Sequence, residues 1–478
     1  MNEFELTVGL EVHAELNTKS KIFCSCQNQF GGPENSKCCP NCLGLPGALP
    51  TLNQGVVESA IRMGIAVGCS VNEHLLQERK NYSYPDLPKS YQISQLSYPI
   101  CYDGSVEFMT DGCVKQVRIS RIQMEEDAGK LLHLGAERYT HVDMNRCGVP
   151  LLEIVTEPDL HSSQEAYDFL ETIRSILSYL EISDCKMQEG SIRCDVNVSV
   201  RPFGNKDPGV RCEMKNVNTF SGAKRAIEYE AKRQIDILKN GGEVPQETRR
   251  WDDEMGVSVL LRSKEDANDY RFFTDPDVSA VSIDAEWIEA LGRDLPEMPY
   301  HKMTRYINEC TLSETDARII SRDIQLARYY DDCIQIDRRL AKSASNWLLG
   351  DVLKLLNSSG DTIDTFSVRP DRLMELLGLV DRGEISGTAA KKILTIMMSD
   401  SSRPTEIMVR EGLQQNNDLK EMQRIIDCVL VQNTAAVNDY KNGRKNVVGF
   451  LVGQCMKESQ GKGNPQLINR LLNDRLGR

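Results

Sequence analysis

Alternating apolar and polar residues predict strands in the first half of the chain. From Phe4 to Val12 every second residue is apolar, and the residues between them are Glu, Thr or Gly. Residues 192–201 show the same alternation, and it resumes at 210–215 after a loop at 202–209 that contains Pro, Gly, Asn and Asp. A period of two residues is typical of a half-buried strand, and two such runs joined by a loop predict an antiparallel hairpin.

Helical periodicity appears between and after these strands. Residues 163–181 and 222–240 place their apolar side chains on one face, and Ser162 with Glu165 predicts a capping box at the first of these helices. From about residue 296 the pattern is almost entirely helical. We therefore predict an α+β protein in which an antiparallel-sheet domain with flanking helices, residues 1–295, is followed by all-α domains at 296–407 and 408–478.

The charge of the chain is uneven. The 478 residues carry a net charge of −13, yet residues 440–478 hold eight Lys/Arg against two Asp/Glu. An acidic chain is not a general nucleic-acid binder, whereas a local basic segment indicates a local contact with an anionic partner. The N-terminus lacks a secretory pattern, and no apolar run approaches the ~18–20 residues that span a bilayer. We expect a cytoplasmic protein with no membrane contact.

Among 16 cysteines, four have the spacing of metal ligands. Cys24 and Cys26 precede a polar loop, and Cys39 and Cys42 follow it. Two close cysteine pairs of this kind are typical of structural zinc, which takes four protein ligands and leaves no position for substrate. The alternative is four unrelated core cysteines, and Cys38 could replace its neighbour as a ligand. Most of the other cysteines, for example Cys194, Cys212 and Cys428, are predicted to be core residues.

The polar positions of the predicted strands carry groups that can bind a cation. Glu11 and His13 share one face, as do Asp195 and Asn197, and Glu213 and Lys215. A solvated face would show the same pattern on any one strand. Three such strands side by side would gather carboxylates and an imidazole, which suit Mg²⁺ or Mn²⁺.

Two further segments have clustered charges that could form a binding site. Residues 79–92 bring cations and tyrosines into a proline-stiffened loop that could hold phosphates or stack a base, although an ordinary surface loop is the alternative. Residues 124–130 place three acids before Gly-Lys, and adjacent carboxylates repel unless a cation neutralises them. A solvated turn is the alternative there. We find no P-loop and no dinucleotide fingerprint.

Long blocks of the sequence together resemble the GatB/GatE family of tRNA-dependent amidotransferase subunits. The resemblance covers nearly the whole chain and includes a tail block at 438–472. The other matching blocks are VGLEVHAELNTKSKIFC (8–24), CPNCLGLPGALPTLN (39–53), RKNYSYPDLPKSYQISQ (79–95), MEEDAGK (124–130), VPLLEIVTEPD (149–159), GSIRCDVNVSVRP (190–202), EMKNVNTF (213–220) and NGGEVPQETRRWD (240–252).

The resemblance implies an ATP-dependent ligase of protein biosynthesis. Such a protein phosphorylates the side-chain carboxylate of Glu or Asp mischarged on tRNA(Gln) or tRNA(Asn), and ammonia then displaces the phosphate. The resemblance implies a heterotrimer in which the A subunit, an amidase (glutaminase), supplies the ammonia and the small C subunit joins the other two. The final domain would bind tRNA. The resemblance does not say which of the two mischarged tRNAs is the substrate.

The resemblance also implies that residues 1–295 are the catalytic (kinase/transamidase) domain, with a zinc-knuckle insertion, and it implies site residues for ATP and Mg²⁺. Catalytic positions of the family match Glu11, His13, Glu126, Asp195 and Glu213. Its Mg²⁺ ligands match Glu11, His13, Glu126 and Glu153, and its ATP-binding positions match Lys80, Tyr82 and Lys89. Structural Zn²⁺ would be held by Cys24, Cys26, Cys39 and Cys42.

One position departs from the family pattern. Relatives have His where this chain has Gln123, which predicts a supporting role for that residue behind the metal ligands. Two other functions stay open at this point: a non-catalytic zinc-containing tRNA-binding module, and a metal-dependent nuclease. A binding module would not need acids and lysines on one face, and a nuclease would cleave tRNA without ATP.

Overall fold

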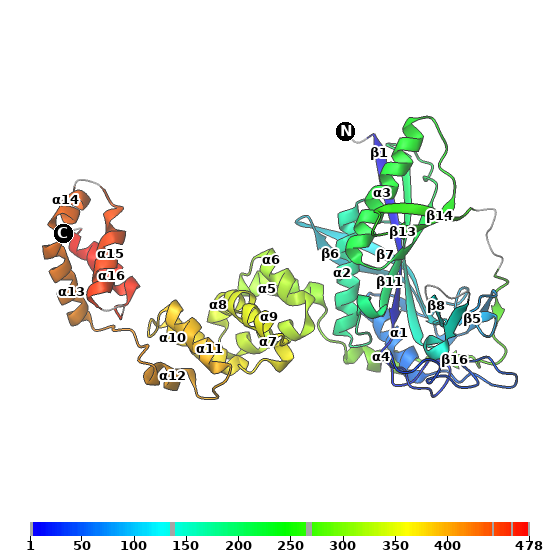
Figure 1. Ribbon diagram of the computed structural model, residues 1–478, viewed down its shortest axis with the longest axis horizontal. Coiled ribbons are helices and arrows are strands. Elements are labelled where there is room, and N and C mark those ends of the chain that lie inside the picture. Colours follow the sequence, from blue (N-terminus) through cyan, green and yellow to red (C-terminus); the bar gives the residue numbers. More distant parts are fainter. Residues whose placement is uncertain (1–2, 134–138, 264–269, 442–443, 460–461, 477–478) are drawn as a thin grey trace. The chain divides into compact units, whose positions relative to one another are not determined.

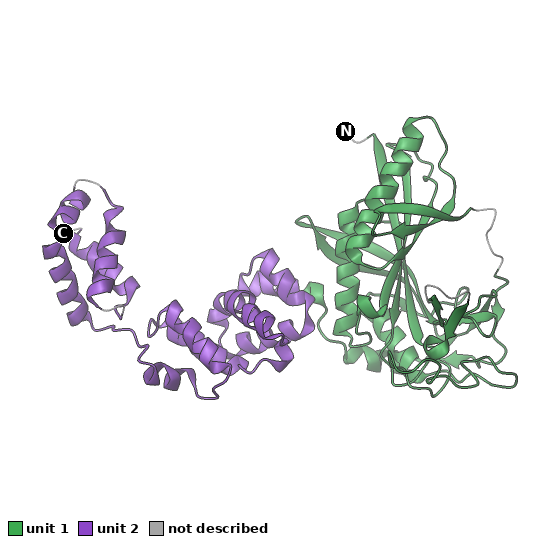
Figure 2. Cartoon of the chain, viewed as in Figure 1, with its two compact units in different colours: residues 1–302 green, residues 303–478 purple. Residues whose placement is uncertain are grey.

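The structure is a computed structural model that describes residues 3–133, 139–263, 270–441, 444–459 and 462–476. The chain forms two compact units, residues 1–302 and 303–478 (Figure 2). The described part of the first unit contains sheets and helices, and that of the second is helical. The predicted α+β class is confirmed, while the domain boundaries expected near 295 and 407 stay predictions.

The first unit is organised around one large sheet, which has nine strands within the described residues. Neighbouring strands are antiparallel except β12 and β13, which are parallel. In sheet order the strands are β14 (Val257–Ser263), β13 (Glu247–Asp252), β12 (Cys212–Val217), β11 (Ile192–Pro202), β1 (Phe4–Glu15), β10 (Pro150–Thr156), β7 (Cys113–Glu126), β6 (Cys101–Thr110) and β2 (Ser70–Val71).

The predicted first strand lies at the centre of this sheet. It is β1, which runs beyond Val12 to Glu15 and pairs with β10 on one side and β11 on the other. The predicted hairpin is also confirmed, because β11 pairs antiparallel with β12. Strand β1 is therefore flanked by strands that lie about 140 and 180 residues further along the chain.

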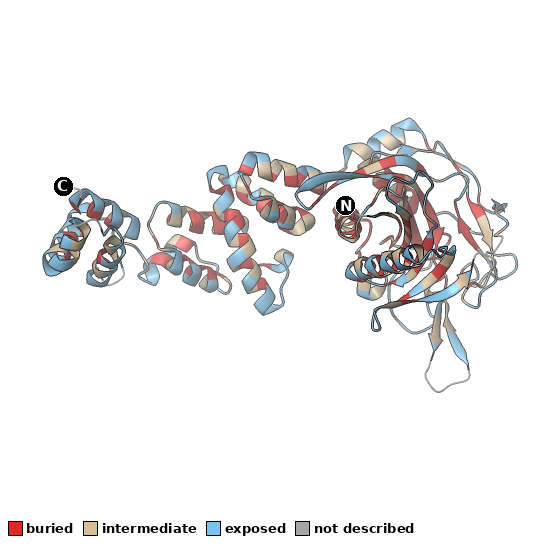
Figure 3. Ribbon diagram, turned by 90° about the horizontal axis from the view of Figure 1, so that it is seen from above, coloured by how far each residue is buried: buried red, intermediate tan, exposed pale blue. Residues whose placement is uncertain are grey.

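One face of the sheet forms the hydrophobic core. Val8, Leu10 and Val12 of β1 are at most 1% exposed, and buried positions run along the strands in Figure 3. Helices contact the sheet and one another on this side (Figure 1). They are α1 (Gln54–Ala66), α2 (Ser163–Tyr179), α3 (Phe220–Lys239) and α4 (Ala285–Arg293).

Only one of the two hydrogen bonds of the capping box predicted for α2 is formed. The side chain of Ser162 accepts a hydrogen bond from the Glu165 amide at 3.0 Å, as expected of an N-cap. The Glu165 carboxylate, however, accepts from the His161 amide at 2.7 Å and not from Ser162. The helix start is fixed as predicted, but the reciprocal bond is made one residue earlier.

Small sheets complete the first unit. A three-stranded sheet consists of β15 (Phe273–Thr274), β4 (Glu78–Asn81) and β5 (Tyr91–Ser94). Side chains of β5 donate to the carboxylate of Glu125 near the end of β7, so this small sheet lies against the polar face of the large one. Two strand pairs remain, β3 (His74–Leu75) with β16 (Val281–Ser282), and β8 (Lys130–His133) with β9 (Thr140–Asp143).

The second unit consists of helices and turns in its described part. Residues 422–476 have a hydrophobic core of their own, which includes Met422, Ile426 and Leu472. Cys428 is exposed, so its prediction as a core residue is wrong, because it lies on the outer face of an amphipathic helix. None of the described helices is both long and apolar enough to cross a membrane. The helices are α5 (Pro299–Cys310, which begins in the first unit), α6 (Glu314–Arg322), α7 (Ile324–Ile336), α8 (Ala341–Trp347), α9 (Leu353–Ser359), α10 (Pro370–Asp381), α11 (Gly387–Met397), α12 (Pro404–Arg410), α13 (Leu419–Gln432), α14 (Thr434–Lys441), α15 (Val447–Glu458) and α16 (Pro465–Leu476).

Candidate functional site

Three central strands bring acids and a histidine together on the polar face of the large sheet. His13 of β1 stands opposite Glu153 of β10 and Arg193 of β11, and Glu11 stands opposite Asp195. Directly opposed residues of antiparallel strands point to the same face. The alternation along β1 and β11 indicated this arrangement, and the register of the strands places these residues side by side.

Glu11, His13 and Glu153 form a group with the size of a cation site. His13 Nε2 lies 3.6 Å from Glu11 Oε1 and 3.9 Å from Glu153 Oε2. One ligand atom from each of the three residues lies within 4.8 Å of the others. His13 Nδ1 is buried and has no hydrogen-bond partner within the described part of the chain. The imidazole thus faces the two carboxylates with Nε2, while its Nδ1 has no partner among the described residues.

Burial shapes the charges in this group. Burial lowers the pKa of His13, and the nearby Arg193 lowers it further, so the ring is held neutral with a lone pair free. Burial also raises the pKa of Glu153 well above its usual value, and the carboxylates of Glu125 and Glu11 add to that rise. A divalent cation would relieve this crowding, and oxygen donors with one imidazole suit Mg²⁺ or Mn²⁺.

The two glutamates at the end of β7 have different surroundings. The Glu126 carboxylate accepts hydrogen bonds from the Lys89 ammonium and from the Ile93 amide. Glu125 is turned toward the group at His13. Burial opposes its charge, but Lys80, His13 and the hydrogen bonds with Glu153 and Ser94 together outweigh burial and lower its pKa. Glu125 also accepts a hydrogen bond from Ser94 Oγ at 2.6 Å. The structure therefore brings Glu125 to the candidate cation site and Glu126 to Lys89.

Glu125 was not among the predicted site residues, although a signal for it exists in the sequence. Met124 is fully buried in the core, so its neighbours in the strand must point to the opposite face. That face carries Gln123 and Glu125 and is shared with Glu153, which pairs with Gln123 in the register. Counting alternate positions along β7 from the buried Met124 therefore places Glu125, and not Glu126, on the polar face.

The cations predicted to face phosphates lie on the small sheet. Lys80 is on β4, 5.1 Å from the ring centre of Tyr270 and 6.0 Å from that of Tyr82. Lys89 precedes β5 and lies 5.2 Å from the ring centre of Tyr91. Lys89 pairs with Glu126 at the end of β7, and the charge of Lys80 acts on the neighbouring Glu125.

A later segment of the chain completes this small sheet. Tyr270 packs edge-on against Tyr82, and its carbonyl accepts a hydrogen bond from the Asn81 amide at 2.9 Å. Arg79 is held by Asp275 and Asp277, each at 2.7 Å. These contacts were not predicted from the sequence, although the aromatic run at 270–273 followed by two acids was a visible signal.

Asp195 and Glu213 share a cation of the protein itself. Lys215 Nζ lies 2.5 Å from Asp195 Oδ2 and 2.9 Å from Glu213 Oε1. Burial opposes the charge of Lys215, but the two carboxylates outweigh it and raise its pKa. Both acids lie on the polar face, as predicted, and the single positive charge of this lysine offsets one of their two negative charges.

An arginine-centred network adjoins the site. Arg193 donates to both carboxylate oxygens of Asp127, at 3.2 and 3.4 Å, and Arg146 approaches the same carboxylate at 3.5 Å. Glu15 lies beside them, where burial and then Asp127 raise its pKa from 4.5 to about 7. Glu15 is thus an acid that titrates near neutral pH at the end of β1.

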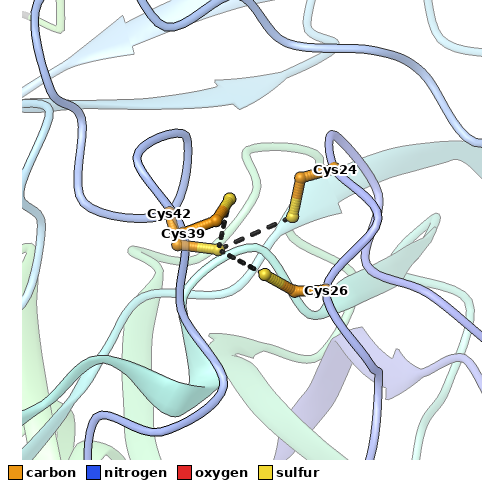
Figure 4. A group of neighbouring side chains, drawn as sticks. All are labelled: Cys24, Cys26, Cys39 and Cys42. Atoms are coloured by element: carbon orange, nitrogen blue, oxygen red, sulfur yellow. Dashed lines mark hydrogen bonds between the residues drawn. The ribbon is translucent and has the colours of Figure 1, made fainter.

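The four predicted zinc ligands lie in one cluster (Figure 4). Cys42 Sγ is 3.6, 3.8 and 3.9 Å from the sulfurs of Cys24, Cys39 and Cys26. Four sulfurs bound at about 2.3 Å around one tetrahedral zinc would lie about 3.8 Å apart. The donor set and its spacing fit zinc, whereas Cys38 points instead to the Asn35 carbonyl.

A buried lysine lies behind the cysteine cluster. Lys21 Nζ donates to the carbonyls of Cys147 and Lys37 at 2.7 and 2.8 Å and lies 3.6 Å from Cys42 Sγ. Hydrogen bonding from Cys24 lowers the pKa of Cys42 to about 4, and Lys21 contributes to that fall. Both contacts favour the thiolate form of Cys42, which is the form that binds a metal.

Comparison with known proteins identifies the family of this chain. Residues 6–289 match the GatB/GatE catalytic domain and residues 328–476 match the GatB domain. Relatives from Caldicellulosiruptor bescii and Thermoanaerobacter pseudethanolicus are 50% and 48% identical over 477 and 476 residues, which is 99% and 100% of this chain and of their own lengths. Each is described as the B subunit of an aspartyl/glutamyl-tRNA(Asn/Gln) amidotransferase. The chain belongs to the GatB/GatE family.

Proposed function

We propose that this chain is the B subunit of a tRNA-dependent amidotransferase and carries out the ATP-dependent step. Its relatives are named as amidotransferase subunits, which makes the chain part of a carbon–nitrogen ligase of translation. Its substrates are Glu-tRNA(Gln), Asp-tRNA(Asn) or both, together with ATP. The A subunit, an amidase, supplies ammonia from glutamine, and the small C subunit completes the heterotrimer.

The reaction has two steps. A side-chain carboxylate oxygen of the mischarged amino acid attacks the γ-phosphorus of ATP, and the bond to the β-phosphate oxygen breaks to release ADP. Ammonia then attacks the acyl carbon, phosphate leaves with the bonding electrons, and the amide nitrogen loses a proton. The first step concentrates negative charge on the phosphoryl oxygens, so its rate depends on nearby cations.

The group of Glu11, His13 and Glu153 is the observation that carries the proposal. These residues would hold Mg²⁺, which would neutralise charge on the transferring phosphoryl group. Lys80 and Lys89 approach the same face from the small sheet and would bind phosphates with Tyr82. The assignment of Glu126 as a further Mg²⁺ ligand stays a prediction, since its carboxylate pairs with Lys89.

Two other predicted site residues would act by holding a lysine in place. Asp195 and Glu213 fix Lys215 on the face that the substrate approaches. A fixed ammonium group there would orient an anionic substrate without any loss of side-chain freedom on binding. Zinc at the four cysteines would be structural, because it would have no free coordination position.

The tail would bind the tRNA backbone. Of the eight Lys/Arg at 440–478, Arg478 lies outside the described residues. Arg444 and Lys445 line a hollow of about 680 Å³ together with Phe450, which is half-exposed. Cations around a concave surface suit the phosphates of folded RNA, which is recognised largely by shape.

ADP release by the purified heterotrimer tests this function. Mischarged tRNA should stimulate ADP release, and Glu11→Ala should lower the stimulated rate by roughly 10²-fold or more, as loss of an electrostatic catalytic group does. Basal glutamine hydrolysis by the partner should survive. Glu107→Ala is a matched control, since Glu107 is exposed on β6 of the same sheet. A normal rate in Glu11→Ala would refute the proposal, and tRNA cleavage without ATP would point to a nuclease.

A further inference from the structure

Gln123 is a buried polar residue in the middle of the candidate cation site. It lies on β7, directly opposite Glu153 of β10, and is 4% exposed. Buried amides are retained where both of their ends find partners, because an unsatisfied polar group is costly. The partners of Gln123 therefore indicate what the residue does.

The amide of Gln123 connects two carboxylates. Its Nε2 donates to Glu153 Oε2 at 2.7 Å and to Glu125 Oε1 at 3.2 Å. Its Oε1 accepts from Arg121 Nε at 3.0 Å. A guanidinium group can only donate, so Arg121 fixes the oxygen end of the amide and turns both N–H groups toward the carboxylates.

The carboxylates that Gln123 connects belong to different strands. Glu153 is on β10 and belongs to the group with Glu11 and His13, whereas Glu125 is on β7 and is held from its other side by Ser94 and Gln92. Without a bridging donor these two acids would repel each other. With it, their oxygens keep a fixed separation on one side of the histidine.

An amide is the group that can do this without removing the charge of the site. A lysine or arginine at this position would neutralise the carboxylates and compete with a metal ion, and a third acid would add to the repulsion. A neutral donor of two hydrogen bonds orders the carboxylates and leaves their negative charge for a cation. Partners behind metal ligands commonly act in this way.

We propose that Gln123 is a positioning residue that holds Glu125 and Glu153 so that both face a divalent cation bound with Glu11 and His13. This inference rests on the cation site of the proposed function and adds to it the residue that sets the site's geometry. Gln123 itself is not a ligand, because both of its amide hydrogens are engaged and its oxygen faces Arg121.

Titration of Mn²⁺ into the full-length chain, followed by the electron paramagnetic resonance signal of free Mn²⁺, tests the proposal. Gln123→Met keeps the volume and removes the amide, and Gln123→Asn keeps the amide but is too short to connect both acids. Each should weaken Mn²⁺ binding by about 10- to 100-fold. Gln116→Met is the matched control, because Gln116 lies on the same strand but is exposed and bonds only to Ser105 among the described residues.

A second measurement separates positioning from general damage to the fold. In the assembled enzyme the Gln123 variants should need more Mg²⁺ for half-maximal ADP release but should recover most of the wild-type kcat at saturating Mg²⁺. Thermal unfolding without Mn²⁺ identifies the variants that are folded. If Gln123→Met does not fold, the comparison is made with Gln123→Asn.

The outcomes distinguish this inference from the proposed function. Wild-type chain that binds no Mn²⁺ overturns the cation site and, with it, the role of Gln123. Wild-type chain that binds Mn²⁺ while a folded Gln123 variant binds it equally well overturns the role of Gln123 alone. Weaker binding in the Gln123 variants, with Gln116→Met unchanged, supports both.

Discussion

Replacing Lys21 with methionine should destabilise the first unit markedly. Lys21 is 1% exposed, and its ammonium group connects three parts of the chain: the loop at Lys37, the turn at Cys147 and the thiolate of Cys42. Methionine fills similar space but donates nothing. The Lys21→Met variant would leave two buried carbonyls without their donor and the cysteine cluster without its neighbouring positive charge.

The size of this effect follows from the two short hydrogen bonds. Hydrogen bonds from a charged group contribute about 1.5–3 kcal/mol each, so their loss costs about 3–6 kcal/mol. Relief from burying the ammonium group offsets part of that, which leaves about 3 kcal/mol. With about 2.1 cal/mol/K of unfolding entropy per residue over residues 1–302, the midpoint of thermal unfolding should fall by about 5 °C.

Scanning calorimetry of the zinc-containing protein measures this shift. Lys19→Met provides the control, because Lys19 lies two residues away and is exposed. The variant at position 21 should also release zinc to a chelator faster than the control. If the unfolding midpoints of the two variants agree within about 1 °C, the ammonium group does not stabilise the unit and the reasoning is wrong.

Three further predictions concern the metal cluster, the tail and pH. Cys39→Ser should lose the single zinc that metal analysis would find in the wild type, whereas Cys38→Ser should keep it; equal zinc in both would refute the cluster. Truncation after residue 407 should raise KM for mischarged tRNA and flatten its salt dependence, leaving glutamine hydrolysis unchanged; an unchanged KM and salt slope would leave the tail without a role in tRNA binding. Because folded Glu15 has a pKa of about 7 against 4.5, wild-type stability should fall as pH rises through that interval, and Glu15→Gln should remove the fall. In urea unfolding, Glu15→Gln should raise the free energy of unfolding above that of the wild type by about 3 kcal/mol at pH 8 and by less than about 1 kcal/mol at pH 5. An increase that does not depend on pH would contradict the assignment.

Local patterns in the sequence predicted the strands and helices themselves better than they predicted which strands lie side by side. Alternation revealed β1 and the β11–β12 hairpin because each has one buried and one polar face. Strand β10 showed no alternation, since it is buried over nearly its whole length. Periodicity also carries no information on which distant strands pair, so the insertion of β1 between β10 and β11 followed only from the structure.

The sequence likewise predicted some features of the candidate site and not others. The zinc cluster was predictable because its ligands are close in sequence and their spacing is characteristic. The shared face of Glu11 and His13 was predictable from strand geometry. The acidic run alone did not indicate Glu125, because the face on which each glutamate lies depends on which residue of β7 faces the core, and the Glu126 assignment stays a prediction. The bridging contacts of Gln123 depend on strand register, which one sequence does not reveal.

The central position of β1 has a consequence for how the protein is made. This strand leaves the ribosome before either of its partners, and β11 ends at Pro202, so at about 5–20 residues per second β1 waits roughly 10–40 s for its second neighbour. Until β11 and α3 join, the apolar side chains of Val8, Leu10 and Val12 lack part of the core that covers them. The nascent chain should therefore depend on chaperones over its first two hundred residues, and slowing translation in this region should increase aggregation before any loss of catalysis is seen.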